Sequence, residues 1–173
     1  NKRVTENTWE SKSHVIRTKI LPYFGERKIA EIEPKDVIAW QNEMLAYKGE
    51  NGEVYSPTYL KTIHAQLSAI FNHAVRFYHL PGNPAQKAGT MGSEEHKEML
   101  FWTKEEYLKF ADAMMDKPLS YYAFEMLYWC GVRLGEMLAL TPSDFDFERN
   151  TVTINKSYQR LKGRDVITSP KTT

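Results

Sequence analysis

A short segment, residues 130–140, combines an arginine, a glutamate and two glycines at spacings that suit phosphate binding. Arg133 stands at the start of an amphipathic helical pattern that directly follows an apolar one. Glu136 comes one helical turn later, where an i,i+3 carboxylate orients a guanidinium, and Gly131 and Gly135 allow backbone or ligand to approach closely. An arginine held in this way is suited to bind phosphate oxygens. Spacing alone leaves a second interpretation open, a salt bridge at a helix start beside a tight turn.

Positive charge is unevenly distributed along the chain, although the formal net charge is only +1. Residues 1–92 carry 12 Lys and Arg against 9 Asp and Glu, whereas residues 93–173 carry 11 against 13. Within the acidic second half, the segment 156–171 is basic and contains Asp165 as its single acidic residue. Its cations are Lys156, Arg160, Lys162, Arg164 and Lys171. A basic hairpin here would attract a phosphate backbone, with Lys162 and Arg164 as DNA contacts. The alternative is a solvated hairpin with ordinary surface charges.

The clearest helix of the first half begins with Ser56 as N-cap and Pro57 as first helical residue. One face is apolar and predicted to be core: Leu60, Ile63, Leu67, Ile70, Phe71 and Ala74. The other face forms a polar strip, defined as Thr58, Lys61, Ala65, Ser68, Asn72 and Arg76. Small side chains let a helix approach a DNA groove, and flanking cations hold phosphates. We therefore expect Lys61, Asn72 and Arg76, with Lys12 on the first helix, to contact DNA. A plain solvent-exposed face is the alternative.

The remaining patterns predict two domains joined by a linker. A first helix is expected from near Thr5 or Thr8 to about Ile20, and a second from Pro34 to about Tyr47. Gly, Pro and charged residues without apolar periodicity follow from Pro81 to about Met99. The predicted organisation is a helical domain at residues 1–84, a linker at 85–99 and a second domain at 100–173.

The second domain is predicted to mix helices with a small antiparallel sheet. Thr103 and Glu106 form a capping box that opens a helix reaching about Met115. A helix at about 119–129 is apolar nearly all round, which places it in a core. Residues 151–154 alternate as a strand does, and a turn at 162–165 leads to a return strand at 166–168.

Composition excludes several classes of protein. The apolar and charged fractions are those of an ordinary globular protein, and no apolar run approaches the roughly 20 residues that span a bilayer. The single cysteine, Cys130, rules out an internal disulfide framework and fits a reducing cytoplasm. We expect a water-soluble protein without a membrane segment.

Several motifs occur in an order that resembles the tyrosine recombinase family, the integrases of phages and conjugative transposons. The segment 130–140 resembles the family's Thr-Gly-x-Arg-x-Gly-Glu-x-x-x-Leu box, with Cys130 in place of Thr. Other family landmarks are, in order, Ile20-Leu21-Pro22-Tyr23-Phe24-Gly25, Ile32-Glu33-Pro34-Lys35-Asp36-Val37, Asn83-Pro84, Phe101-Trp102-Thr103-Lys104-Glu105-Glu106 and Ser169-Pro170-Lys171-Thr172.

The resemblance implies a mainly α fold with a small antiparallel β-sheet. It would be a helical core-binding, SAM-like domain followed by the first half of an α+β catalytic domain. It also implies a bacterial cytoplasmic enzyme that cuts and rejoins double-stranded DNA through a phosphotyrosyl intermediate, without metal or cofactor. Arg133 would match the first catalytic arginine, Glu136 its supporting acid, and Lys171 a lysine that protonates the departing 5′ oxygen.

The sequence departs from the family pattern at its far end. It contains no His-x-x-Arg box and no tyrosine at the nucleophile position, so we expect a fragment that cannot cleave DNA by itself. Family members act as tetramers on paired sites, whereas this chain is expected to be a monomer. Two other functions remain open: a DNA-binding regulator that kept the helical module without catalysis, and a helical protein-interaction domain.

Overall fold

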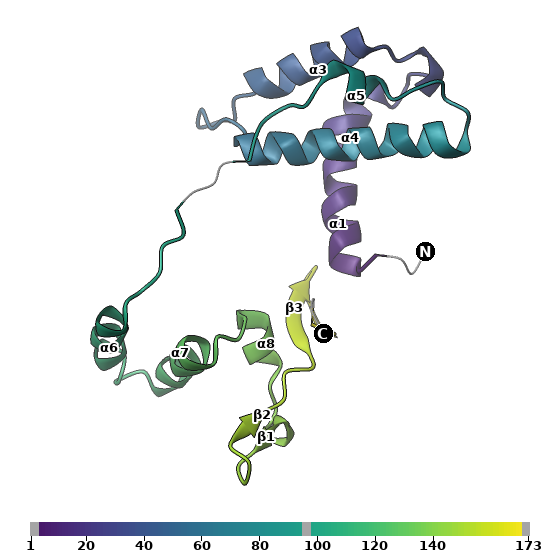
Figure 1. The fold of residues 1–173 in the computed structure, drawn as a ribbon. Coiled ribbons are helices and arrows are strands. Elements are labelled where there is room, and N and C mark those ends of the chain that lie inside the picture. Colours follow the sequence, from purple (N-terminus) through teal and green to yellow (C-terminus); the bar gives the residue numbers. More distant parts are fainter. Residues whose placement is uncertain (1–3, 95–97, 171–173) are drawn as a thin grey trace. The chain divides into compact units, whose positions relative to one another are not determined.

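The computed structural model describes residues 4–94 and 98–170 of the chain. It divides into two compact units, unit 1 (1–98) and unit 2 (99–173), which are labelled by element in Figure 1. The described residues are mainly helical, with two small antiparallel sheets, so the predicted fold class is confirmed. No helix in the described part of the chain is long and apolar enough to cross a membrane.

The regular secondary structure among the described residues of unit 1 is helical. They are α1 (Glu6–Val15), a π-helical turn η1 (Ile16–Ile20), α2 (Leu21–Phe24), a 3-10 turn η2 (Ile29–Glu31), α3 (Pro34–Ala46), α4 (Pro57–Phe77) and α5 (Pro84–Ala88). The predicted caps are present: the Thr5 and Ser56 hydroxyls accept the backbone N–H of Thr8 and Tyr59. Pro22 does not stop the first helix, because it occupies the first turn of α2, where its missing N–H is not needed.

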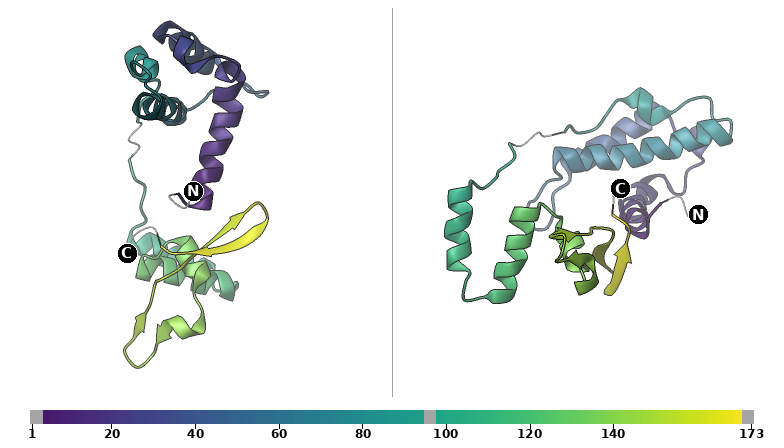
Figure 2. Two further views of the ribbon diagram at one scale, coloured as in Figure 1. Left: turned by 90° about the vertical axis from the view of Figure 1, so that its right-hand side faces the viewer. Right: turned by 60° about the horizontal axis from the view of Figure 1, so that its bottom comes forward.

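The core of unit 1 is built mainly from α3 and α4, with side chains from α1, η1, α2 and α5. Its largest fully buried side chains are Trp40, Phe71, Ile63, Leu67 and Val37. In Figures 1 and 2, α3 and α5 lie along one side of the long helix α4, and α1 crosses α4. The predicted apolar face of α4 is confirmed as core, apart from Ile70, which is only partly buried.

Residues 85–91, which were predicted to belong to the linker, pack within unit 1. Asn83 caps α5 by accepting from the N–H groups of Ala85 and Gln86, at 2.9 and 3.1 Å. Ala85 and Met91 are 0% and 2% exposed. The segment is too short for a periodic pattern to show, and a small helix held by one capping asparagine gives no stronger sequence signal than a turn.

Unit 2 begins with three helices, α6 (Lys104–Ala113), α7 (Pro118–Cys130) and α8 (Leu134–Ala139), followed by the 3-10 turn η3 (Pro142–Asp144). The capping box of Thr103 and Glu106 is confirmed at the start of α6. Four strands follow, β1 (Phe145–Asp146), β2 (Thr151–Val152), β3 (Ser157–Leu161) and β4 (Arg164–Thr168).

The strands form two separate hairpins, whereas the sequence analysis predicted one. β1 pairs with β2, and β3 pairs with β4, with Tyr158 opposite Ile167. The first hairpin arises because the Asp146 carboxylate accepts from the N–H groups of Glu148 and Arg149, and Asn150 adopts a positive φ of 51°. This Asx turn folds residues 151–152 back onto β1, so β3 becomes the partner of β4.

The expectation that α7 lies in a core is wrong for the described residues. None of its side chains is buried, and Leu119, Tyr122 and Trp129 are more than half exposed. Tyr128 stacks on Tyr107 of α6 with ring centroids 3.7 Å apart, so only one side of the helix is covered. Apolar composition predicts a tendency to be buried, but neighbouring elements decide whether it is satisfied.

Candidate phosphate site and nucleic-acid interface

Arg133 and Glu136 are brought together as the sequence predicted, at the start of α8. Arg133 Nη1 donates to Glu136 Oε1 at 2.8 Å, and the Arg133 backbone N–H donates to Glu136 Oε2 at 3.0 Å. The Glu136 side chain is 9% exposed, whereas that of Arg133 is 62% exposed. One carboxylate therefore holds both the backbone and the guanidinium of Arg133, while most of the guanidinium surface remains accessible.

The local backbone explains this geometry. Gly131 ends α7 in the left-handed conformation, with φ 62° and ψ 21°, which favours glycine. Arg133 is then extended, with φ −74° and ψ 149°, and serves as the N-cap of α8. Hydrogen bonds from the Arg133 backbone and side chain lower the pKa of Glu136. The carboxylate thus stays ionised at neutral pH and keeps its charge opposite the guanidinium.

Glycine at position 135 lets α8 lie directly against β3. A Cβ at Gly135 would lie 2.7 Å from both Ser157 Oγ and the Tyr158 carbonyl oxygen. The hairpin β3–β4 extends away from α6 and α7 in Figure 2 and turns at Lys162 and Gly163, which have positive φ angles of 49° and 78°.

Two of the predicted basic DNA contacts, Lys162 and Arg164, lie at this turn and are exposed, on the hairpin that packs against α8. Lys171 lies outside the described residues.

A partly buried ion pair connects the turn after α8 to the residue before β3. Lys156 Nζ lies 2.7 Å from Asp144 Oδ1 and 3.3 Å from Thr141 Oγ1. The Asp144 carboxylate also accepts from the Thr141 backbone N–H and hydroxyl. The Lys156 ammonium and these hydrogen bonds lower the pKa of Asp144 to about 2.

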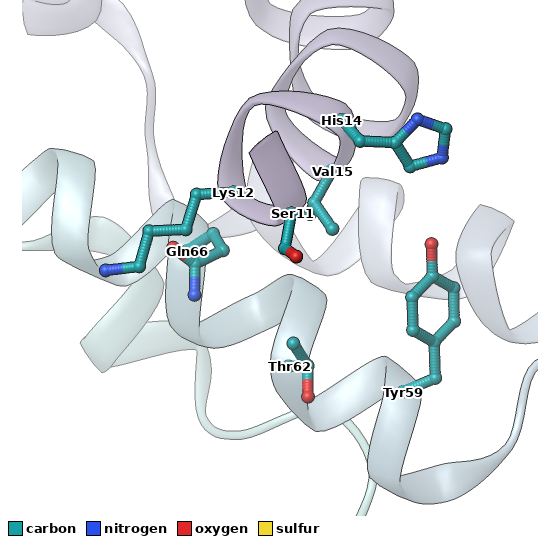
Figure 3. Close-up of a pocket in the computed structure, with 7 residues that line it drawn as sticks. All are labelled: Ser11, Lys12, His14, Val15, Tyr59, Thr62 and Gln66. Atoms are coloured by element: carbon teal, nitrogen blue, oxygen red, sulfur yellow. The ribbon is translucent and has the colours of Figure 1, made fainter. Parts of the chain in front are cut away.

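Unit 1 has an open groove of about 500 Å³ between α1 and α4. Figure 3 shows Lys12 and Gln66 at one end, Ser11 and Thr62 in the middle, and His14 and Tyr59 at the other end. Val15 forms part of the floor. Of the DNA contacts predicted in unit 1, Lys12 is the one that lines this groove.

The polar strip on α4 is only partly open. The Asn83 amide donates to Asn72 Oδ1 at 2.8 Å and to Ser68 Oγ at 3.0 Å, and Lys61 Nζ pairs with Glu94 Oε1 at 2.6 Å. Segment 83–94 therefore contacts one flank of the strip. Arg76 lies over the Phe77 ring, with its guanidinium carbon 5.3 Å from the ring centroid. Lys61 and Asn72 are thus paired with Glu94 and Asn83, which belong to unit 1 itself.

Comparison with known proteins relates the chain to integrases of mobile elements. Residues 1–45 match the family described as phage integrase, N-terminal SAM-like domain. The integrase of the element ICEBs1 from Bacillus subtilis (strain 168) is 29% identical over 96% of the chain and 44% of its own length. The integrase of Staphylococcus phage L54a is 26% identical over 69% of the chain and 39% of its own length. The chain thus spans less than half the length of these relatives.

Solved structures with a similar fold are also integrases. The Tn1549 transposon integrase in complex with a circular intermediate DNA superposes with a TM-score of 0.78 at 21% identity, covering 99% of this chain and 54% of the solved integrase chain. A lambda integrase dimer bound to a COC′ core site gives a TM-score of 0.63 at 20% identity, covering 98% and 44%. The chain shares its fold with these two integrases. The family resemblance found in the sequence is confirmed.

Within this integrase fold, sequence reasoning missed most residues of the α1–α4 groove. Ser11, His14, Tyr59, Thr62 and Gln66 were not among the predicted contacts. A helical wheel places Thr62 and Gln66 beside the polar strip, so the helical period of the sequence could have indicated these two residues. The pattern of α4 does not say which flank is contacted by a later segment, so the contacts of Lys61 with Glu94 and of Asn72 with Asn83 could not be predicted from it.

The described part of this integrase-like chain contains no cluster of three or more His, Cys, Asp or Glu side chains able to hold a metal ion. The acidic groups at the candidate site are instead each satisfied by a cation and backbone donors. Glu136 faces Arg133, and Asp144 faces Lys156.

Proposed function

We propose that the chain binds duplex DNA as part of a site-specific tyrosine recombinase in which Arg133 clamps the phosphate that is cut. The observation that carries this proposal is the guanidinium of Arg133, which is 62% exposed yet oriented by the nearly buried Glu136. Such a preorganised donor does not have to reorder when negative charge builds on a phosphate. Glu136 acts on Arg133 and not on DNA.

The chemistry expected of Arg133 is charge stabilisation. A guanidinium has five N–H donors, and the bond to Glu136 through Nη1 leaves others for the two non-bridging phosphate oxygens. In a full recombinase a tyrosine attacks the phosphorus, and the 5′ oxygen leaves with a proton. None of the ten tyrosines matches the nucleophile position of the family pattern, and Tyr158, on the hairpin that packs against α8, donates to Asp165 Oδ1 at 2.7 Å. The chain by itself is therefore proposed to bind DNA without cutting it.

We assign duplex binding in unit 1 to the α1–α4 groove. Lys12, His14 and Ser11 present a cation and small polar groups suited to backbone phosphates, while Thr62 and Gln66 are suited to base edges. The Tn1549 and lambda integrases of the two solved structures are bound to DNA, which supports the same ligand here. Tetrameric assembly on paired sites belongs to the same proposal for the whole recombinase.

The test is duplex binding by fluorescence anisotropy across a salt series. We expect affinity to fall steeply as salt rises, because phosphate contacts release counterions. Arg133→Ala should weaken binding about tenfold or more, since a hydrogen bond to a charged group contributes about 1.5–3 kcal/mol. Arg149→Ala is the matched control: Arg149 is an exposed arginine of unit 2 that pairs with Asp146, and its loss should leave affinity nearly unchanged.

Unit 1 is tested in the same assay with Lys12→Ala and Gln66→Ala, and with Lys48→Ala as an exposed control. Lys12→Ala should weaken binding to all duplexes and reduce the salt slope by about one, whereas Gln66→Ala should change the preference between sequences. If the groove variants weaken binding while Arg133→Ala does not, the non-enzymatic DNA-binding regulator is the better function. Salt-insensitive or absent duplex binding would contradict both and favour a protein-interaction domain.

A further inference from the structure

The ion pair of Lys156 and Asp144 stands apart from the residues already assigned to DNA. Asp144 is 8% exposed, and the side chain of Lys156 is 26% exposed, so this is a largely covered pair in a unit with little apolar core. Lys156 immediately precedes β3, and Asp144 closes the turn that follows α8. The pair therefore joins the turn after the helix that begins after Arg133 to the residue immediately before the hairpin β3–β4.

A second contact holds the near end of the same helix. Gly135, two residues after Arg133, lies so close to Ser157 and Tyr158 that an added Cβ would be 2.7 Å from an oxygen of each. Helix α8 thus contacts β3 through Gly135 near its start and is tied to β3 through Asp144 and Lys156 after its end. Besides the packing of α8 along β3, these two attachments lie at opposite ends of the helix and together define how the hairpin is oriented against it.

We propose that Lys156 is a positioning residue that fixes the hairpin β3–β4 against the helix following Arg133. Its role is to place the cations at the hairpin turn, Lys162 and Arg164, at a set position relative to the Arg133 guanidinium, so that all three meet one DNA backbone. The expected effect of Lys156 on DNA binding rests on the proposed function. The fixed orientation of the hairpin does not depend on it and can be measured without DNA.

Loss of Lys156 should release the hairpin without unfolding the turn. Asp144 keeps two donors in the Thr141 backbone N–H and hydroxyl, at 2.7 and 2.8 Å. The Asp144 carbonyl also still accepts the Thr153 N–H at 2.8 Å, which preserves the β1–β2 hairpin. What disappears is the side-chain link to the start of β3, so we expect β3–β4 to pivot about the Gly135 contact.

The geometric test uses the single native cysteine. Cys130 is exposed at the end of α7, and Ile167 on β4 is 57% exposed, so Cys130 and an Ile167→Cys site accept spin labels for pulsed electron-paramagnetic distance measurement. The expected result is a narrow distance distribution in the otherwise unchanged chain and a clearly broadened one with Lys156→Met. Lys156→Arg, which keeps the charge and can bridge both carboxylate oxygens, should restore the narrow distribution. Lys109→Met, at an exposed lysine on α6, is the control.

Circular dichroism separates pivoting from unfolding, because a merely stabilising residue would change the melting temperature without broadening the distances of the folded state. If Lys156→Met unfolds unit 2, Lys156→Gln retains a hydrogen-bond donor and should broaden the distribution to a smaller extent. A distribution as narrow as that of the unchanged protein, in any folded variant lacking the charge, overturns the proposal.

The functional test is a double-mutant cycle on duplex affinity with Arg133→Ala and Lys156→Met. Arg133 and Lys156 form no hydrogen bond or ion pair with one another in the described structure, so additive effects are the default. If Lys156 positions the hairpin, Arg133→Ala should weaken binding about tenfold in the unchanged background and less than about threefold in the Lys156→Met background.

The outcomes of the two tests separate the claims. If the chain binds no duplex, the proposed function is wrong. The distance measurement still decides whether Lys156 fixes the orientation of the hairpin. A chain that binds duplex with fully additive effects of the two substitutions overturns the positioning role of Lys156 on DNA.

Discussion

Units 1 and 2 are held together in different ways. Unit 1 buries large apolar side chains around Trp40 and Phe71, and its core extends from Val15 on α1 to Met91 after α5. In unit 2, among the described residues, the buried apolar side chains are Tyr107, Ala111 and Ala139. Both units have regular helices with good caps, so the difference lies in tertiary burial and not in local structure.

The comparison shows that the two units position functional groups by different physics. In unit 1, apolar burial fixes α1 and α4, and the groove between them follows from where the helices pack. In unit 2, the candidate phosphate site is held by ion pairs, reciprocal hydrogen bonds and one close glycine contact. Polar contacts are directional but individually modest, so the geometry of unit 2 should respond to single substitutions and to pH more than that of unit 1.

The largest expected effect is on unit 1. Trp40→Ala removes a side chain that is 0% exposed, and such a loss costs about 3–5 kcal/mol of unfolding free energy. Trp129→Ala in unit 2 is the matched change, and because Trp129 is 53% exposed we expect less than about 1 kcal/mol. Denaturant unfolding followed by circular dichroism measures both, and similar losses at the two sites would abolish the distinction between the units.

The next largest expected effect tests the close packing of α8 against β3 in unit 2. Gly135→Ala gains about 1 kcal/mol of helix propensity. It also places a Cβ 2.7 Å from the Tyr158 carbonyl oxygen, a backbone atom that cannot move aside as easily as a side chain. Overpacking of this kind costs about 1–3 kcal/mol, so we expect net destabilisation of unit 2. Gly82→Ala, whose Cβ would meet the Lys87 side chain at an ordinary 3.6 Å, is the control. Equal thermal melting of both variants would argue against the close contact.

Acid should affect the polar site of unit 2 through Asp144. Its pKa is lowered from 3.8 to about 2, so the unfolded chain binds the proton first as pH falls, and the pair's stabilisation is complete above about pH 4. That stabilisation is lost as pH drops towards 2. Lys156→Met should raise the pKa of Asp144 and move the acid transition of unit 2 to higher pH, whereas Lys109→Met should not. Carboxyl carbon NMR shifts followed against pH measure the change directly.

The smallest effect is the pH response of unit 1. Burial lowers the pKa of His64, whose Nδ1 lies 3.3 Å from the Gln41 amide nitrogen. Between its ordinary pKa of 6.5 and its lower native value, the unfolded state binds more protons, so unit 1 should lose a little stability from pH 7.5 to 5.5. His64→Asn should flatten this dependence in denaturant titrations at the two pH values. If the stability of unit 1 still depends on pH in this variant, a group other than His64 causes the dependence.

Local signals in the sequence located much of this structure. Ser56, Pro57 and the capping box of Thr103 and Glu106 set helix starts correctly, because caps act between residues three apart. The pairing of Arg133 with Glu136 was predicted for the same reason. The exposure of α7 and the contact of Asn72 with Asn83 were not, because they depend on which distant segments pack against a helix, and no local spacing contains that information.

The first turn of α8 offers a direct way to observe the candidate site. Glu136 accepts the Arg133 backbone N–H with one oxygen and the guanidinium with the other. When the Glu136 carboxylate rotates away, both hydrogen bonds break, which frees the Arg133 amide proton to exchange and releases the guanidinium. Hydrogen–deuterium exchange at this one amide therefore reports how often the guanidinium is held in place, in the absence of any ligand.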